Sequence, residues 1–109
     1  MIAQTPPTPY YAVIFTSIRT EIGDDAYAET ADRMVELGST MPGFLGIESA
    51  REGIGITVSY WKDLESIRHW KHQTEHILAR DKGRAFWYAA FKTRICRVER
   101  DYDFEKTVL

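Results

Sequence analysis

The chain has 109 residues, of which 44% are hydrophobic and 13% aromatic, a composition that suits one folded domain and excludes an intrinsically disordered chain. Its 14 Lys and Arg and 16 Asp and Glu give a formal net charge of −2 and form no basic stripe for nucleic acid. No apolar stretch approaches the roughly 20 residues of a membrane span, no signal-peptide pattern opens the chain, and the lone Cys96 permits no intrachain disulfide, so we expect a cytoplasmic protein that binds neither membrane nor nucleic acid.

The first half of the chain predicts a leader, a strand and a helix. Residues 1–9 contain three closely spaced prolines, which favour an extended conformation, and we expect a flexible leader there. A run of β-branched and aromatic residues predicts a strand over residues 10–19. Apolar residues three and four positions apart then predict an amphipathic helix over residues 25–41, which ends at Pro42-Gly43.

The second half predicts a hairpin, a second helix and a last strand. Two β-rich runs, 44–51 and 54–61, flank Glu52-Gly53, where glycine permits the positive φ of a tight turn. Alternating residues over 90–100 predict the last strand. Between them, Asp63 can cap a helix over 63–80 that carries along one side Leu64, Ile67, Lys71, Thr74 and Leu78, with Trp70 and Ile77 beside them.

The order β-α-β-β-α-β is typical of a ferredoxin-like α+β domain, which we expect over residues 10–104 with a short tail at 105–109. Such a domain has a four-stranded antiparallel sheet with both helices on one face. The other face of the sheet is then uncovered. Because the predicted strand 54–61 alternates large apolar with small residues, we expect an apolar sheet face that pairs with a second copy in a homodimer.

Five short motifs lie in a fixed order along this domain: Met41–Gly46, Tyr60–Asp63, Trp70 with His76, residues 83–88, and Val98–Tyr102. In order and spacing they resemble the antibiotic biosynthesis monooxygenase proteins of the dimeric α+β barrel superfamily. The resemblance covers nearly all of residues 10–104. It implies two protomers whose sheets meet in a barrel, with a cavity between sheet and helices in each protomer. Some members of that family are oxygenases that need no metal or flavin, and others degrade haem.

The resemblance implies a cofactor-independent monooxygenase that acts on a small aromatic or polycyclic molecule, and we expect neither a cofactor nor a bound metal. His76 is the candidate acid–base residue, because imidazole titrates near neutrality and can accept a phenol proton and later return it. Flat side chains that could wall a pocket, or alternatively fill the core, stand beside it. The pocket candidates are Trp61, Trp70, His72, Trp87 and Tyr88.

Two departures from the family pattern leave alternatives open. The chain contains no Asn, whereas characterised members of the haem-degrading and quinone-forming branches use a pocket asparagine. A non-catalytic ligand-binding or stress-related dimer is therefore an alternative function. The haem-degrading branch places its iron-ligating histidine about ten residues beyond the helical tryptophan, where this chain has Arg80, so haem binding is a weaker alternative.

Two further patterns can be interpreted either as functional sites or as ordinary solvated surface side chains. Residues 72–76 spell the H-x-x-E-H signature of a class of zinc proteases, but no third ligand stands out, and a solvated pair of histidines on a helix is the simpler interpretation. Arg51, Arg84 and Arg100 could clamp a ligand carboxylate, although lone arginines are commonly solvated ion-pair partners.

Overall fold

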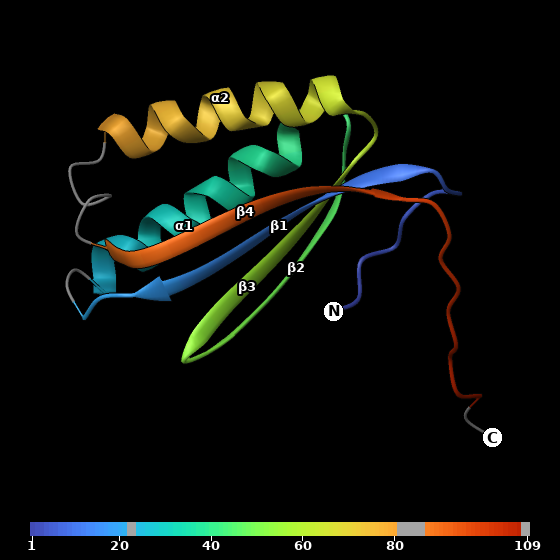
Figure 1. The fold of residues 1–109 in the computed structure, drawn as a ribbon, viewed down its shortest axis with the longest axis horizontal. Coiled ribbons are helices and arrows are strands. Elements are labelled where there is room, and N and C mark those ends of the chain that lie inside the picture. Colours follow the sequence, from blue (N-terminus) through green and yellow to red (C-terminus); the bar gives the residue numbers. More distant parts are fainter. Residues whose placement is uncertain (22–23, 81–86, 108–109) are drawn as a thin grey trace.

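The computed structural model describes residues 1–21, 24–80 and 87–107, without the side chains of Asp24 and of residues 78–80. The predicted βαββαβ order is confirmed, and Figure 1 shows both helices on one side of the sheet. The elements are β1 (Tyr10–Arg19), α1 (Asp24–Thr40), β2 (Phe44–Glu52), β3 (Ile54–Trp61), α2 (Leu64–Arg80) and β4 (Tyr88–Val98).

The sheet has the order β2-β3-β1-β4, and each neighbouring pair is antiparallel. Phe15 of β1 lies opposite Thr57 of β3 and Thr93 of β4, so these positions share the face that meets the helices. On β3 this face carries the small residues Gly55, Thr57 and Ser59, followed by Trp61. The β-branched apolar side chains of β3, Ile54, Ile56 and Val58, therefore lie on the face that the helices leave uncovered.

The predicted boundaries hold within one residue except in the last strand. Gly53 has a φ of 75° in the turn between β2 and β3, as a tight hairpin requires. β4 runs from Tyr88 to Val98 rather than from 90 to 100. It starts earlier because Arg19 pairs with Tyr88 across a register shift in the β1–β4 ladder. Residues 83–86 of the fourth motif lie outside the described residues.

Helix α2 begins as predicted, and its buried stripe is the predicted side turned toward Trp70 and Ile77. The Asp63 carboxylate accepts hydrogen bonds from the Ser66 backbone N–H at 2.8 Å and from the Ser66 hydroxyl at 2.6 Å, which caps the helix. The predicted side is wrong at Leu64, which is 48% exposed, and at Lys71, which is exposed. The stripe that turns toward the sheet consists of Ile67, Trp70, Thr74 and Ile77.

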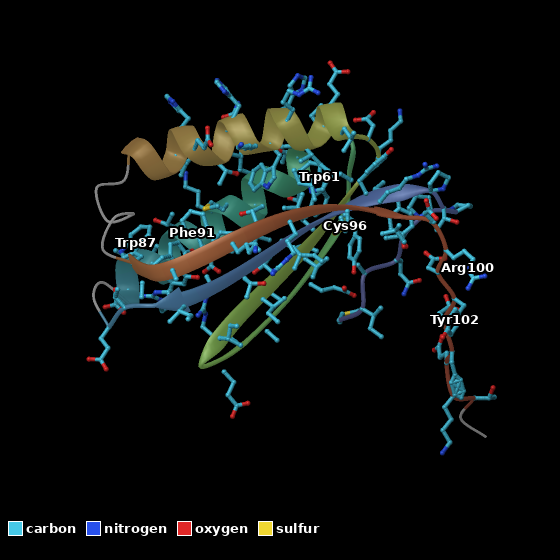
Figure 2. The ribbon with its side chains drawn as sticks, in the orientation of Figure 1. Trp61, Trp87, Phe91, Cys96, Arg100 and Tyr102 are labelled. Atoms are coloured by element: carbon cyan, nitrogen blue, oxygen red, sulfur yellow. The ribbon has the colours of Figure 1, made fainter. Side chains whose placement is uncertain are left out.

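An aromatic core forms where α2 crosses the end of β3, and Figure 2 shows Trp61 between the helices and the sheet. Trp61 is fully buried. It stacks on Trp70 with ring centroids 5.7 Å apart and meets Phe44 edge-on at 5.4 Å. Its indole N–H donates to the Ser59 hydroxyl at 2.9 Å, so this buried donor is paired.

The two ends of the chain run along and beyond the sheet. The Ala3 backbone N–H donates to the Glu48 carboxylate at 2.9 Å, which ties the leader to β2. Beyond β4, residues 99–107 leave the sheet as an extended segment on which Tyr102 is 97% exposed (Figure 2). Neither described helix has the length and apolar character of a membrane-spanning segment.

Candidate functional site

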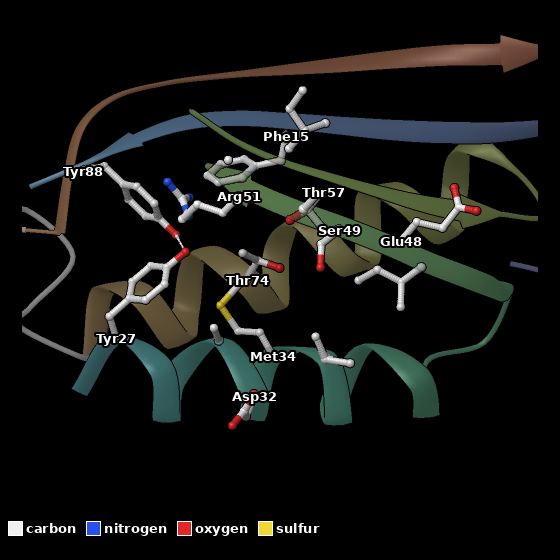
Figure 3. Close-up of a pocket in the computed structure, with 16 residues that line it drawn as sticks. Phe15, Tyr27, Asp32, Met34, Glu48, Ser49, Arg51, Thr57, Thr74 and Tyr88 are labelled. Atoms are coloured by element: carbon white, nitrogen blue, oxygen red, sulfur yellow. Dashed lines mark hydrogen bonds between the residues drawn. The ribbon is translucent and has the colours of Figure 1, made fainter. Parts of the chain in front are cut away.

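A cavity of about 520 Å³ lies between the helices and the helix-facing side of the sheet (Figure 3). Cavities of this size hold small organic ligands. Its apolar walls come from the sheet and from α1, namely Phe15, Ala31, Met34, Val35 and Ile47. Hydroxyl groups from five elements line it as well, namely those of Tyr27, Ser49, Thr57, Thr74 and Tyr88.

One end of the cavity forms a polar corner from Tyr27, Arg51 and Tyr88. The Tyr88 hydroxyl donates to the Tyr27 hydroxyl at 3.3 Å, and Figure 3 shows the two rings meeting tip to tip. Strand alternation counted back from Phe91 would direct Tyr88 to the opposite face. The register shift beside Arg19 turns it toward the helices instead, as bulges commonly do near binding sites.

The residues behind the polar corner hold Tyr27 in place. The Arg19 guanidinium lies over the Tyr27 ring at 3.5 Å, and its Nε donates to the Trp87 carbonyl at 3.0 Å. The Trp87 ring meets the Tyr27 ring edge-on at 5.8 Å. Burial, reinforced by the hydrogen bond to Tyr27, raises the pKa of the Tyr88 hydroxyl, so Tyr88 stays a neutral hydrogen-bond donor.

Arg51 reaches the polar corner from the end of β2. Its Nη2 donates to the hydroxyl of Ser17 at 2.6 Å, and Ser17 is only 2% exposed. A Cβ placed on Gly55 would lie 2.1 Å from the same nitrogen. The guanidinium therefore lies over the backbone of Gly55, in the space that a side chain at position 55 would occupy.

The sequence-predicted pocket residues fall into two groups. Tyr88 lines the cavity, whereas Trp61, Trp70 and Trp87 stand behind it: Trp61 and Trp87 are buried, and Trp70 stacks on Trp61. His72 and His76 are both exposed on α2 and are absent from the described lining of the cavity. Among the described side chains of α2, it is Thr74 that lines the cavity.

Those of the remaining candidates that the structure describes do not gather at the cavity. Among the described residues, no group of three or more His, Cys, Asp or Glu side chains could hold a metal ion. Arg100 is exposed on the segment beyond β4 (Figure 2), and Arg84 and the Arg80 side chain lie outside the described residues.

Sequence reasoning missed Phe15, Tyr27 and Thr74 as cavity residues. Phe15 and Tyr27 looked like ordinary apolar positions of a strand and a helix. Thr74 carried a usable signal, because it is a polar residue within the apolar stripe of an amphipathic helix. The Oγ1 of Thr74 is buried and has no hydrogen-bond partner among the described residues.

Comparisons with known proteins agree with this architecture. A family model described as antibiotic biosynthesis monooxygenase matches residues 9–82. The uncharacterized protein YqjZ of Bacillus subtilis is 50% identical over 107 residues, which cover 96% of this chain and 93% of YqjZ. Two solved structures share the fold at low sequence identity. PA3566 from Pseudomonas aeruginosa has a TM-score of 0.66 and 16% identity, and the match covers 87% of this chain and 97% of PA3566. SnoaB, a cofactor-independent oxygenase from Streptomyces nogalater, has a TM-score of 0.64 and 11% identity, and the match covers 91% of this chain and 100% of SnoaB.

Proposed function

This chain belongs to the antibiotic biosynthesis monooxygenase family, and from that membership we propose that it is a cofactor-independent monooxygenase acting on a small aromatic or polycyclic molecule. The cavity of about 520 Å³ between sheet and helices carries the proposal. Its walls are largely apolar, and Tyr27, Arg51 and Tyr88 form a polar corner at one end, an arrangement that holds a flat molecule and orients its oxygen atoms. SnoaB, a cofactor-independent oxygenase with this fold, adds support by analogy.

The reaction needs no external reductant when a phenol is oxidised to a quinone. One ring C–H and the phenol O–H are lost, one oxygen atom of O2 becomes the new carbonyl, and the other leaves as water. The phenol supplies four electrons and O2 accepts four. The protein's part is to exclude water, to orient the ring and to favour the phenolate, which passes an electron to O2 more readily than the neutral phenol does.

The acid–base role of His76 stays a prediction. Its exposed side chain is not part of the described cavity lining, whereas the hydroxyls of Tyr27 and Tyr88 are. A tyrosine that remains neutral can donate a hydrogen bond to a substrate oxygen but does not serve as the base. In the proposed reaction the substrate's own acidity therefore supplies the phenolate, and the proton leaves through water.

Ligand binding without catalysis is the second candidate function. The absence of Asn from all 109 residues and the exposure of His76 favour it. Under this function the cavity still binds an aromatic molecule, but O2 is not consumed.

Oxygen uptake separates the two candidates. The purified protein is incubated with dihydroxynaphthalenes under ¹⁸O2, while an electrode follows oxygen and mass spectrometry follows the product. The proposed function requires protein-dependent oxygen uptake and one ¹⁸O atom in the product. Saturable binding of the same compounds with no uptake above the protein-free rate would select the binding function.

We also propose that the protein is a homodimer joined through the uncovered face of the sheet. Ile18, Ile54 and Ile56 lie on that face and are 49%, 48% and 42% exposed. Light scattering at micromolar concentration should give twice the chain mass of 12.6 kDa. Ile56→Lys should shift the mass toward that of one chain, and a wild-type protein that is already monomeric would refute the dimer.

A further inference from the structure

The charge of Arg51 has no counterpart in the described cavity. Its only hydrogen bond among the described residues goes to a neutral hydroxyl, that of Ser17, which uses one of the five N–H groups of a guanidinium. No described carboxylate forms an ion pair with it. Asp32 is among the residues that line the cavity, but Figure 3 shows its carboxylate turned away from Arg51. The Glu48 carboxylate at the cavity rim accepts hydrogen bonds from the Tyr60 hydroxyl at 2.6 Å and from the Ala3 backbone.

The groups around Arg51 are hydrogen-bond donors. The Tyr27 hydroxyl accepts a hydrogen bond from Tyr88, so its own O–H is free to donate one, and no described residue accepts that hydrogen bond. Thr74 lines the same cavity and adds a buried hydroxyl that no described residue pairs with. A native fold seldom leaves such an atom unpaired, so its position points to a ligand that pairs with it.

We propose that the ligand is an anionic aromatic molecule, whose carboxylate or phenolate oxygen binds Arg51 while its ring lies against Phe15 and Met34. This inference rests on the proposed function only in taking the cavity as the substrate site. Arg51 presents paired N–H groups that suit an anionic oxygen, and Tyr27 donates to the same oxygen or to its neighbour. The apolar wall and the cation therefore select an acidic aromatic over a neutral one.

Gly55 is part of this selectivity, because it keeps Arg51 over the sheet. A methyl group at position 55 would occupy the place of the guanidinium, so Gly55→Ala should displace the charge without removing it. Gly55 is thus a positioning residue for Arg51.

Isothermal titration with 2-naphthoate and its neutral isostere 2-naphthamide tests the inference, and 2,4-dinitro-1-naphtholate distinguishes phenolate from carboxylate. The wild-type protein should bind an anion about tenfold or more tightly than the amide, since a charge-assisted pair is worth roughly twice a neutral hydrogen bond. Arg51→Gln and Gly55→Ala should each abolish the preference. Arg33→Gln, which removes an exposed arginine on α1, should retain it. Melting temperatures show which variants are folded, and Arg51→Gln, at an exposed position, keeps the test valid if Gly55→Ala does not fold.

The outcomes separate this inference from the proposed function. Equal binding of anion and amide by the wild-type protein, or a preference that survives Arg51→Gln, would overturn the anionic ligand and leave the oxygenase proposal standing. A preference that depends on Arg51, together with no oxygen uptake from any phenol, would refute the oxygenase and uphold the anion site. No binding of any of the three probes would overturn both.

Discussion

The two ends of the space between sheet and helices are built in opposite ways. At one end the rings of Phe44, Trp61 and Trp70 form the tightly packed aromatic core, and the buried indole N–H of Trp61 donates to Ser59. At the other end the polar corner borders a cavity that is also lined by Thr74 and Arg51, and among the described residues the Thr74 hydroxyl has no hydrogen-bond partner and Arg51 has no ion-pair partner. The first arrangement stabilises the fold. The second leaves one buried hydroxyl without a described partner and a solvated cation without a counter-ion, and a ligand in the cavity can supply both.

Removing a ring should have the largest effect, and it should differ between the two ends. Trp61→Ala should lower the free energy of unfolding by about 3–5 kcal/mol, because it leaves a void among close-packed rings. Tyr27→Ala, at a half-buried position beside an existing cavity, should cost less than half of that. Urea titration of both variants measures the difference. Equal losses would break the contrast between a packed end and an open one.

A hydroxyl deletion in the aromatic core should have the next largest effect. Ser59→Ala should cost about 1–3 kcal/mol, because it leaves the Trp61 indole N–H buried without an acceptor. The matched control is Ser49→Ala, since Ser49 is an exposed cavity residue and its loss should change stability by about 0.5 kcal/mol or less. A Ser59→Ala variant as stable as the control would show that the hydrogen bond adds nothing.

The corresponding change at the cavity should have the opposite sign. Thr74→Val keeps the shape of the side chain and removes a hydroxyl that has no partner in the part of the chain that the structure describes, so stability should stay constant or rise by about 1 kcal/mol. Affinity for an aromatic ligand should fall several-fold in the same variant. A clear loss of stability would indicate that the Thr74 hydroxyl is satisfied within the protein.

The contrast also explains how much of the molecule its sequence could predict. Strand alternation, helix periodicity and the turn at Gly53 reflect local preferences and the demand for one buried face, so the element order and most boundaries followed from them. Tyr88 faces the cavity through a bulge in the β1–β4 ladder, and a bulge depends on pairing between residues about 70 positions apart. The position of the Arg51 guanidinium likewise depends on Ser17 and Gly55, which lie on two other strands. Cavity residues are set by such non-local geometry, which periodicity does not encode.

The smallest effect should come from His76, which lies outside both regions. An exposed imidazole on α2 contributes little to packing, so His76→Ala should change stability by about 0.5 kcal/mol or less. If the hydroxyls of the polar corner and the acidity of the substrate suffice, turnover of a phenol that the wild-type protein oxidises should stay within about twofold. Arg68→Ala, at another exposed position of α2, is the matched control for surface effects. A loss of about 10²–10⁴ in rate at an unchanged melting temperature is the signature of an acid–base residue. That result would show that His76 reaches the substrate in the working enzyme, and it would move the chemistry from the polar corner to the outer side of α2.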